Sequence, residues 1–314
     1  MKMPLLVKIE NFQKSHWLKE MKLTWKILCS NPVSSAGLII FGLFIICVIF
    51  GPLLAPHGMN DINLSNKLMP PSHHDWFGTD SLGRDIFSRV IYGARISFLS
   101  GIVIVGITSL FGGIIGIVAG YISKLLGDIL MRVTDVFLAF PTLILAMALA
   151  STLGPGLWSA LFALSVVNWP KYARLVYGQT LSLKENEFVK YAETLRESPI
   201  TIMLRHILPN LLGSVIVQAS LDFGGAIILI AILGFIGLGA QPPTPDWGTM
   251  VSEGRSYIMD AWWMAIIPGL AIFVVCAACN LIGDGLRDAY DPNLRHTKIY
   301  KNSDASKELI LENE

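Results

Sequence analysis

The residues best suited to ionic chemistry form two repeats in the first third of the chain. Asp80 and Arg84, and likewise Asp85 and Arg89, stand four positions apart with the acidic residue first. On a helix this order favours an ion pair, and Thr79 or Asp80 would cap such a helix at its start. We therefore expect a short surface helix here that leads into the next apolar run.

The adjacent residues His73 and His74 in the same region are candidate metal ligands. Neighbouring residues do not share a helix face, and no carboxylate at a suitable spacing completes a ligand set around this pair. We therefore expect no metal site from these residues.

Two carboxylates lie within apolar runs, Asp135 and Asp222. An ionisable residue at membrane depth is a functional candidate by default, so both are candidates for a polar pathway. For Asp222, a contact with a partner subunit is a further explanation. The alternative is a structural carboxylate that is hydrogen-bonded between helices. Gly224 and Gly225, beside Asp222, would also allow the helix to bend during gating.

The motifs of several enzyme classes are absent from the sequence. There is no Gly-x-x-x-x-Gly-Lys-[Ser/Thr] loop to cradle phosphates, and no Gly-Lys dipeptide at all. His-Glu-x-x-His and Gly-x-Ser-x-Gly are missing too. We expect no catalysis and no cofactor in this chain, and it should not hydrolyse ATP.

The composition places the chain in a membrane. Of the 314 residues 53% are hydrophobic and only 15% are charged, and the mean hydropathy is +0.57. A soluble domain carries about 25% charged residues, which argues against a soluble enzyme or a disordered scaffold. The net charge of +1 provides no basic field for a nucleic acid. The expected partner is the lipid bilayer.

An all-α membrane protein with six transmembrane helices is the expected fold. A bilayer-spanning helix needs about 20 apolar residues, and six runs approach that length. Gly112, Gly116 and Gly120, four apart in the second run, would let another helix approach closely. The expected spans are residues 33–55, 96–122, 129–153, 157–173, 211–238 and 262–282.

The distribution of positive charge predicts the orientation. With six spans, one side of the membrane collects 19 Lys and Arg residues and the other side five. The positive-inside rule then places both termini in the cytoplasm. We expect a cytoplasmic amphipathic segment over 1–32, which either lies on the inner leaflet or is a mobile basic tail. We expect a transmembrane domain over 33–284 and a cytoplasmic tail over 285–314.

Three connecting segments are longer than a simple bundle needs. Residues 56–95 and 239–260 would lie outside, the second stiffened by three prolines within four residues. Residues 178–210 would lie inside as a helix–turn–helix, in which Ser198 and Pro199 start a second helix that stops near Pro209. Its apolar residues would dock into a groove on another protein, or would pack only on their own bundle.

Four segments of the chain occur together, in this order, in one protein family. They are residues 77–89 with 93–97, residues 169–174, residues 187–210 and residues 235–248. With them the chain resembles, over about residues 31–292, the permease subunits of bacterial ATP-binding-cassette (ABC) importers. The branch is the one that handles dipeptides, oligopeptides and nickel, and the likeness is to the second of its two permeases.

The resemblance implies a type I ABC importer permease fold in the bacterial cell membrane, with a cytoplasmic loop that couples to the ATPase. The implied partners are a second homologous permease, one or two kinds of cytoplasmic ABC ATPase subunit and an extracytoplasmic solute-binding protein. The coupling-loop residues would be Glu187, Ala192, Leu195, Arg196, Ser198, Pro199, Arg205, His206 and Pro209. The outer-face residues would be Gly78, Thr79, Asp80, Gly83, Arg84, Asp85 and Arg89.

The coupling loop departs from the family pattern. Lys190 and Tyr191 replace the usual Glu and first Ala, and Arg196 replaces a Gly. Since glycine accepts a left-handed turn that arginine adopts only at a cost, the loop either turns without a positive φ or accepts some strain. A specialised ATPase partner is a further explanation.

The resemblance implies ATP-driven import of di- or oligopeptides, with nickel or another metal chelate as the alternative cargo. An ATP-independent secondary transporter would also explain six spans with Asp135 and Asp222, but it leaves a docking loop without a partner. A membrane-embedded enzyme is a third reading, for which we find no nucleophile or metal constellation.

Overall fold

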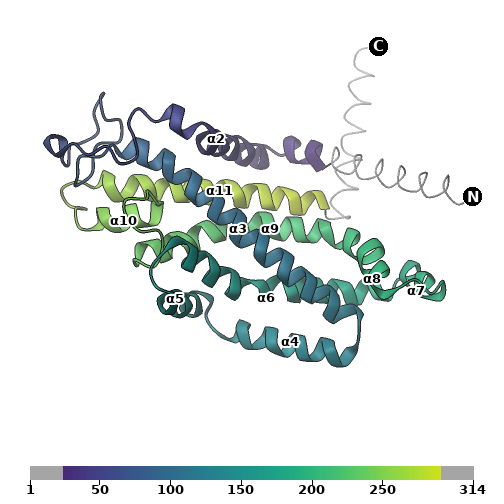
Figure 1. Cartoon of the computed structure of the whole chain (residues 1–314). Coiled ribbons are helices and arrows are strands. Elements are labelled where there is room, and N and C mark those ends of the chain that lie inside the picture. Colours follow the sequence, from purple (N-terminus) through teal and green to yellow (C-terminus); the bar gives the residue numbers. More distant parts are fainter. Residues whose placement is uncertain (1–23, 291–314) are drawn as a thin grey trace, which may run out of the picture.

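A computed structural model describes residues 24–290 of the chain, which are helical apart from their connections (Figure 1). Residues 24–30 form a helical segment that leads into α2. The expectations for residues 1–23 and 291–314, including most of the amphipathic segment, lie outside the described residues. The elements are α2 (Pro32–Leu54), η1 (Leu64–Asn66), α3 (Ile86–Tyr121), α4 (Lys124–Ala139), α5 (Thr142–Leu153), α6 (Leu157–Lys184), α7 (Glu187–Thr194), α8 (Pro199–Ile202), the π-helical η2 (Met203–Ile207), α9 (Leu208–Phe235), α10 (Trp247–Arg255) and α11 (Trp263–Tyr290).

Four of these helices are long and apolar enough to cross a bilayer: α2, α3, α9 with its preceding turns, and α11. The bent pair of α4 and α5 would make a fifth span. α6 has 28 residues but is not among them, and it contains the polar residues Asn168, Lys171 and Arg174. Multiple spans are therefore confirmed, whereas the number six stays a prediction.

The third expected span is not one continuous helix. α4 ends at Ala139, α5 begins at Thr142, and their axes differ by 89°. Pro141 lies at the break and explains it, because proline has no N–H for the helix ladder and disfavours helical backbone at the preceding residue. The apolar run continues through the bend, so hydropathy alone does not reveal it.

Glycine contacts fix the relative directions of the helices. A Cβ on Gly116 would lie 2.7 Å from the Ala173 carbonyl oxygen, and one on Gly120 would lie 2.7 Å from the Thr180 Cβ, so α3 and α6 run parallel. The expected close approach at this glycine face is thereby confirmed. Because α3 and α6 are consecutive long helices in parallel, the α4–α5 pair must carry the chain back between them.

The remaining long helices alternate in direction. Gly37 of α2 contacts Leu281 of α11 and Gly285 of α11 contacts Ser34, so these two helices are antiparallel. α9 is antiparallel to α11, since Gly224 meets Cys276 and Gly213 meets Tyr290.

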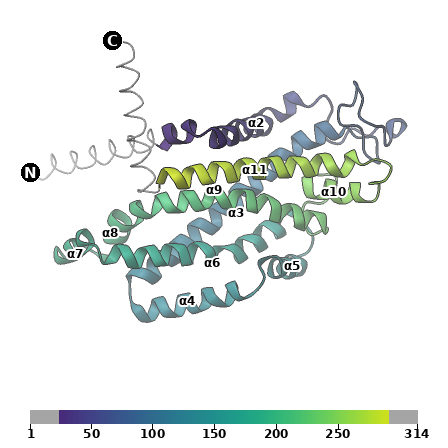
Figure 2. The same cartoon turned by 180° about the vertical axis from the view of Figure 1, so that it is seen from behind.

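As a result, residues 24–30, the end of α11 and the α7–α8 region all lie at one end of the bundle. The segment that follows α2 lies at the opposite end, and so does helix α10 (Figures 1 and 2).

Candidate functional site

The segment between α6 and α9 forms a bent elbow, residues 187–207, at one end of the bundle. Ser198 caps α8 by accepting a hydrogen bond from the Thr201 N–H at 3.2 Å, as the sequence predicts. The second helix does not stop near Pro209, because the π-helical turn η2 joins α8 to α9. In this wider turn the Leu208 N–H bonds to the Met203 carbonyl, which accommodates the missing N–H of Pro209 in a continuous helix.

One face of the elbow is buried against its own bundle. Val189, Ala192, Ile202 and Ile207 are at most 2% exposed. They form one apolar cluster with Ile117 and Tyr121 of α3, Val176 of α6 and Leu211 of α9. Part of the elbow therefore does pack on its own bundle, and Ala192 belongs to that part.

The elbow also exposes several large apolar side chains. Tyr191, Leu195, Ile200 and Leu204 are each 59–66% exposed, and Phe188 is 42% exposed. Water solvates such side chains poorly, and a cluster of them marks an interaction surface. We call these five residues the elbow face.

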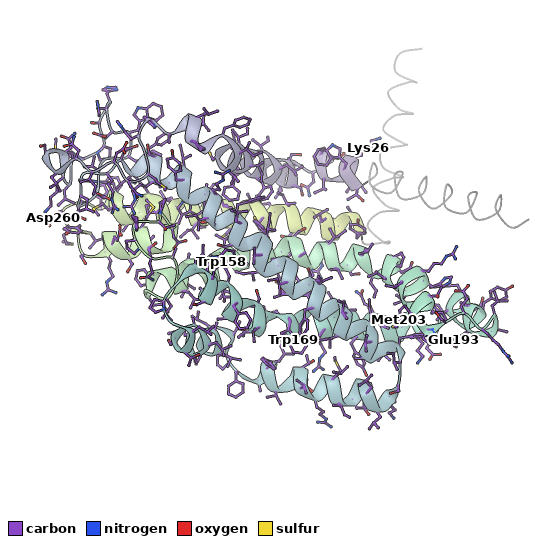
Figure 3. All side chains as sticks on the ribbon, viewed as in Figure 1. Lys26, Trp158, Trp169, Glu193, Met203 and Asp260 are labelled. Carbon is purple, nitrogen blue, oxygen red and sulfur yellow. The ribbon has the colours of Figure 1, made fainter. Side chains whose placement is uncertain are left out.

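Polar contacts tie the elbow to the bundle. The Tyr121 hydroxyl donates to the Glu193 carboxylate at 3.1 Å, and the Lys184 ammonium donates to the Tyr121 carbonyl at 2.9 Å. Within the elbow, His206 Nε2 lies 3.0 Å from Glu197 Oε2. Figure 3 places Glu193 and Met203 together at this end of the molecule and Asp260 at the other. The elbow is therefore joined to α3 by a hydrogen bond, in addition to the apolar cluster that it shares with α3, α6 and α9.

A second expected site, the outer-face residues, builds a rigid buried turn instead of the predicted short helix. Thr79 and Asp85 form an isolated β-bridge, and α3 begins only at Ile86. The cap is Asp85, which accepts from the Ser88 N–H at 2.8 Å, and neither Thr79 nor Asp80. Because Asp85 is used in this way, the expected Asp85–Arg89 ion pair does not form.

Asp80 instead binds both arginines. Its Oδ2 lies 2.6 Å from Arg84 Nε and 2.6 Å from Arg89 Nη1, and its Oδ1 accepts from the N–H groups of Leu82 and Arg84. Glu253 of α10 lies 3.2–3.4 Å from the same guanidinium groups. Asp80, Arg84 and Arg89 are at most 4% exposed, so this network joins the turn, α3 and α10. No local pattern in the sequence pointed to Glu253 as a partner of these arginines.

The glycines of this turn are required by its shape. Gly78 and Gly83 have φ values of +74° and +73°, which other residues adopt only at a cost. A Cβ on Gly78 would also lie 2.7 Å from the Met69 carbonyl oxygen and from Trp263 Nε1. The polar groups of the outer-face residues thus point inward and hold the loop in place.

The following outer segment, residues 239–260, is anchored to the bundle as well. Trp247 Nε1 donates to the Val90 carbonyl at 2.9 Å, and Asp246 caps α10 by accepting from the Thr249 N–H. Burial raises the pKa of Asp246 to about 6, although its hydrogen bonds with Thr249 and Gly248 oppose that rise.

The two intramembrane carboxylates lie apart and in different surroundings. Asp135 of α4 pairs with Arg174 of α6, and both side chains are about half exposed. This contact matches the structural alternative for Asp135. Asp222 is half-buried on α9 and lines a cavity of about 50 Å³ between α3, α6 and α9.

The cavity beside Asp222 is polar on its α6 side. Asn168, Lys171 and Tyr172 line it, together with Thr108 of α3 and Gly225 of α9. Within the described part of the chain, the buried Tyr172 hydroxyl has no hydrogen-bond partner of standard geometry, although Asp222 lies near enough to act on it. No ion pair within 4.0 Å joins Lys171 to Asp222 among residues 24–290. Lys171 lies on α6 and Asp222 on α9, so no local sequence spacing pointed to this pair.

The two glycines beside Asp222 differ from each other. A Cβ on Gly224 would lie 3.2 Å from the Cys276 carbonyl oxygen, so Gly224 serves the contact with α11. Gly225 is exposed, meets no atom within 4 Å at its Cβ position and lines the cavity. α9 is continuous through both residues.

Comparison with known proteins assigns a family to this arrangement. Residues 112–296 match the family described as "Binding-protein-dependent transport system inner membrane component", and residues 20–71 match the "N-terminal TM domain of oligopeptide transport permease C". The chain belongs to this permease family. It is therefore a multi-pass membrane transport component, and proteins of its kind work with ATPase subunits and a solute-binding protein.

Several curated relatives of this permease align along nearly its whole length. The probable D,D-dipeptide transport system permease DdpC of Escherichia coli K12 is 44% identical over 280 residues, which are 89% of this chain and 94% of the relative. The dipeptide permease DppC of Alkalihalophilus pseudofirmus is 45% identical and covers 86% and 89%. The glutathione permease GsiD of Escherichia coli O157:H7 is 43% identical and covers 81% and 84%.

A solved structure supports the fold of the permease. One chain of the MetNI methionine ABC transporter, in an inward-facing conformation, superposes with a TM-score of 0.52 at 18% identity. The match covers 66% of this chain and 96% of that one. An importer permease fold is thus confirmed for the common part.

In the elbow of this permease, Arg196 stands where the family usually has glycine. Of the two alternatives for this turn, the backbone adopts the strained one, with a positive φ. Arg196 has φ +58°. It ends α7 in a Schellman motif, in which the Glu197 N–H bonds to the Ala192 carbonyl and the Arg196 N–H to the Glu193 carbonyl. The turn therefore has the shape that glycine favours, although arginine occupies it.

Replacing Arg196 with glycine should stabilise the permease by about 1 kcal/mol, because glycine adopts the left-handed conformation without a steric cost. Thermal unfolding of the detergent-solubilised protein measures this. Arg205→Gly is the matched control: Arg205 lies in a helical turn, so glycine there should destabilise by about 1 kcal/mol. Equal losses of stability in both variants would contradict the role assigned to the Arg196 turn.

Proposed function

We propose that this chain forms half of the translocation pathway of an ATP-driven peptide importer and receives the work of ATP hydrolysis through its elbow. The observation that carries the proposal is the elbow face. It presents five exposed apolar side chains, while the other side of the same segment is packed against α3, α6 and α9. A partner that moves this surface would therefore move the bundle.

Geometry and charge together support the proposed orientation. Helix directions bring the elbow to the same end as residues 24–30 and the end of α11. The positive-inside rule assigns that end, which is rich in Lys and Arg, to the cytoplasm. The termini and the elbow would then face the cytoplasmic ATPases, one or two kinds of subunit. Residues 56–95 and 239–260 would face the external solute-binding protein.

A second homologous permease would complete the pathway. The cavity beside Asp222 opens on one side of a single bundle, and the exposed Lys171 and Gly225 lie at its edge. A half-pathway of this kind needs a facing surface to enclose its cargo. We place a heterodimeric partner there, in accordance with the two-permease systems that the sequence resembles.

Peptides are the proposed cargo, supported by relatives that carry dipeptide and glutathione transport names. A strain that lacks the gene for this chain should lose uptake of a labelled dipeptide by at least tenfold and keep uptake of labelled nickel. Restoring the gene should restore dipeptide uptake, and depleting ATP should abolish it. Loss of nickel uptake alone would favour a metal chelate as cargo, and uptake without ATP would contradict the mechanism.

The Asp222 cavity offers complementary charges for a peptide. A zwitterionic peptide carries one ammonium and one carboxylate, and Lys171 and Asp222 line the same cavity without an ion pair between them. The Tyr172 hydroxyl, which lies beside Asp222, adds a buried polar group to the same cavity. We therefore place a transient contact for the peptide termini here.

Asp222→Asn and Lys171→Met should each slow dipeptide uptake at least tenfold, which is about 1.4 kcal/mol, because each removes one charge that faces the peptide. ATPase association should not change, since none of the residues that line the cavity belongs to the elbow face. Labelled uptake and co-purification measure the two effects. Asp128→Asn, an exposed carboxylate on α4, is the control; unchanged uptake in both cavity variants would contradict the contact.

A further inference from the structure

Three potential metal ligands converge at the outer end of the bundle, away from the cavity and the elbow. They are His57, just after α2, and the neighbouring His74 and Asp75. One ligand atom from each lies within 4.8 Å of the others. We propose that these three residues bind a divalent transition metal ion of the zinc class. The sequence pattern did not reveal this site, because His57 lies 17 positions before His74. His73, the neighbour of His74, is not part of the group.

The distances suit a tetrahedral ion. His74 Nδ1 lies 3.3 Å from Asp75 Oδ2. Two ligands of a tetrahedral zinc ion with bonds of about 2.05 Å stand roughly 3.3 Å apart, so this pair is already at the required separation. The His57 and His74 rings are stacked with centroids 5.7 Å apart and planes at 28°. The ligand atom of His57 lies within 4.8 Å of the other two, so the His57 side chain would have to move closer to complete a tetrahedral set.

A simple ion pair does not explain the whole cluster. The contact of His74 with Asp75 at 3.3 Å leaves the close approach of the His57 ring to the His74 ring unexplained. A metal ion accounts for both rings, because two neutral imidazoles and one carboxylate form a common ligand set for zinc. A cavity of about 180 Å³ next to the cluster leaves room for a water as fourth ligand.

The backbone around the ligands is already fixed. The His57 N–H donates to Ser88 Oγ at 3.1 Å, and Ser88 Oγ donates in turn to the Asp85 carboxylate. The Asp75 N–H donates to Ser72 Oγ, and its carbonyl accepts from the N–H groups of Ser72 and Gly78. Ion binding therefore needs little reordering of the chain.

The ion would join two parts of the outer surface. His57 belongs to the segment that leaves α2, whereas His74 and Asp75 belong to the turn that precedes α3. Asp75 is buried and His74 is exposed, so the ion would sit at the surface with one side open to water. The ion would cross-link these two parts of the outer loop. This role does not depend on which solute the permease carries.

Zinc binding to the full chain tests the proposal. The protein is purified in detergent without a histidine tag, stripped with a chelator and titrated with zinc chloride in a calorimeter. We expect one equivalent to bind with a Kd in the micromolar range or below, and binding at least tenfold weaker in His57→Ala, His74→Ala and Asp75→Asn. His73→Ala, adjacent but outside the cluster, should bind as the wild type does.

Two outcomes would overturn the site: no saturable binding to the wild-type protein, or a loss in His73→Ala equal to that in the cluster variants. Cobalt provides a second measurement that needs no variant. Co²⁺ bound to the wild-type protein should show the intense visible absorption of a tetrahedral site, and the weak spectrum of an octahedral aqua ion would contradict the proposed ligands.

Discussion

Replacing Asp80 with asparagine is expected to lower the free energy of unfolding of this permease by about 3–5 kcal/mol, the typical cost of removing one partner from a buried ion pair. The Asp80 carboxylate lies 2.6 Å from both Arg84 and Arg89, and all three residues are buried. Asparagine keeps the size and one acceptor oxygen but not the charge. The two guanidinium groups would then have only the carboxylate of Glu253, which is more exposed than Asp80, as a negatively charged partner. Thermal or denaturant unfolding in detergent measures the loss.

The matched control for Asp80 is Glu185→Gln. Glu185 and Lys190 form an exposed pair at 2.8 Å, in which the hydrogen bond and the charge of Lys190 lower the pKa of Glu185. Exposed pairs add little to stability, so this change should leave the unfolding midpoint unchanged. The role of the Asp80 network would be refuted if Asp80→Asn unfolded at the same midpoint as Glu185→Gln.

Replacing Leu195 with glutamate is expected to abolish ATP-driven uptake and to weaken association with the ATPase subunits by about 30-fold or more. Leu195 is 59% exposed within the elbow face. A central apolar side chain in an interface is commonly worth 2 kcal/mol or more, and a carboxylate in its place would lose its water on docking. Co-purification of the ATPase subunits with the permease measures association, and labelled dipeptide uptake measures coupling.

Two further variants isolate the docking effect of Leu195. Met259→Glu places the same charge on a residue that is 90% exposed in the segment before α11, at the other end of the molecule, and it should keep ATPase association. Ala192→Glu is informative in a different way: Ala192 is 2% exposed in the cluster with α3 and α6, so this change should lower the unfolding midpoint. Normal co-purification of Leu195→Glu would refute docking through the elbow face.

Local sequence patterns predicted those features that depend on one segment alone. Apolar runs predicted α2, the later part of α3, α9 and α11, because burial in lipid demands apolar residues along a whole helix. Ser198 and Pro199 predicted the start of α8, since capping satisfies free N–H groups within one turn. Gly112, Gly116 and Gly120 predicted a close helix contact, although not that α6 would be the partner.

Some local patterns also allowed more than one outcome. Asp80/Arg84 and Asp85/Arg89 have the same spacing and order, yet Asp80 binds both arginines and Asp85 caps α3. The i,i+4 rule holds only on a helix, and the Thr79–Asp85 bridge removes that condition. Pro141 likewise broke an apolar run that composition alone treats as continuous.

The sequence by itself determined the membrane class, the family and the position of the elbow, because each depends on composition or on residues close together in the chain. Only the tertiary structure decided which face of the elbow is free, that Glu253 joins Arg84 and Arg89, and that His57 meets His74 and Asp75. These contacts join segments far apart in sequence, and their partners are selected by the packing of whole helices, which no local spacing encodes.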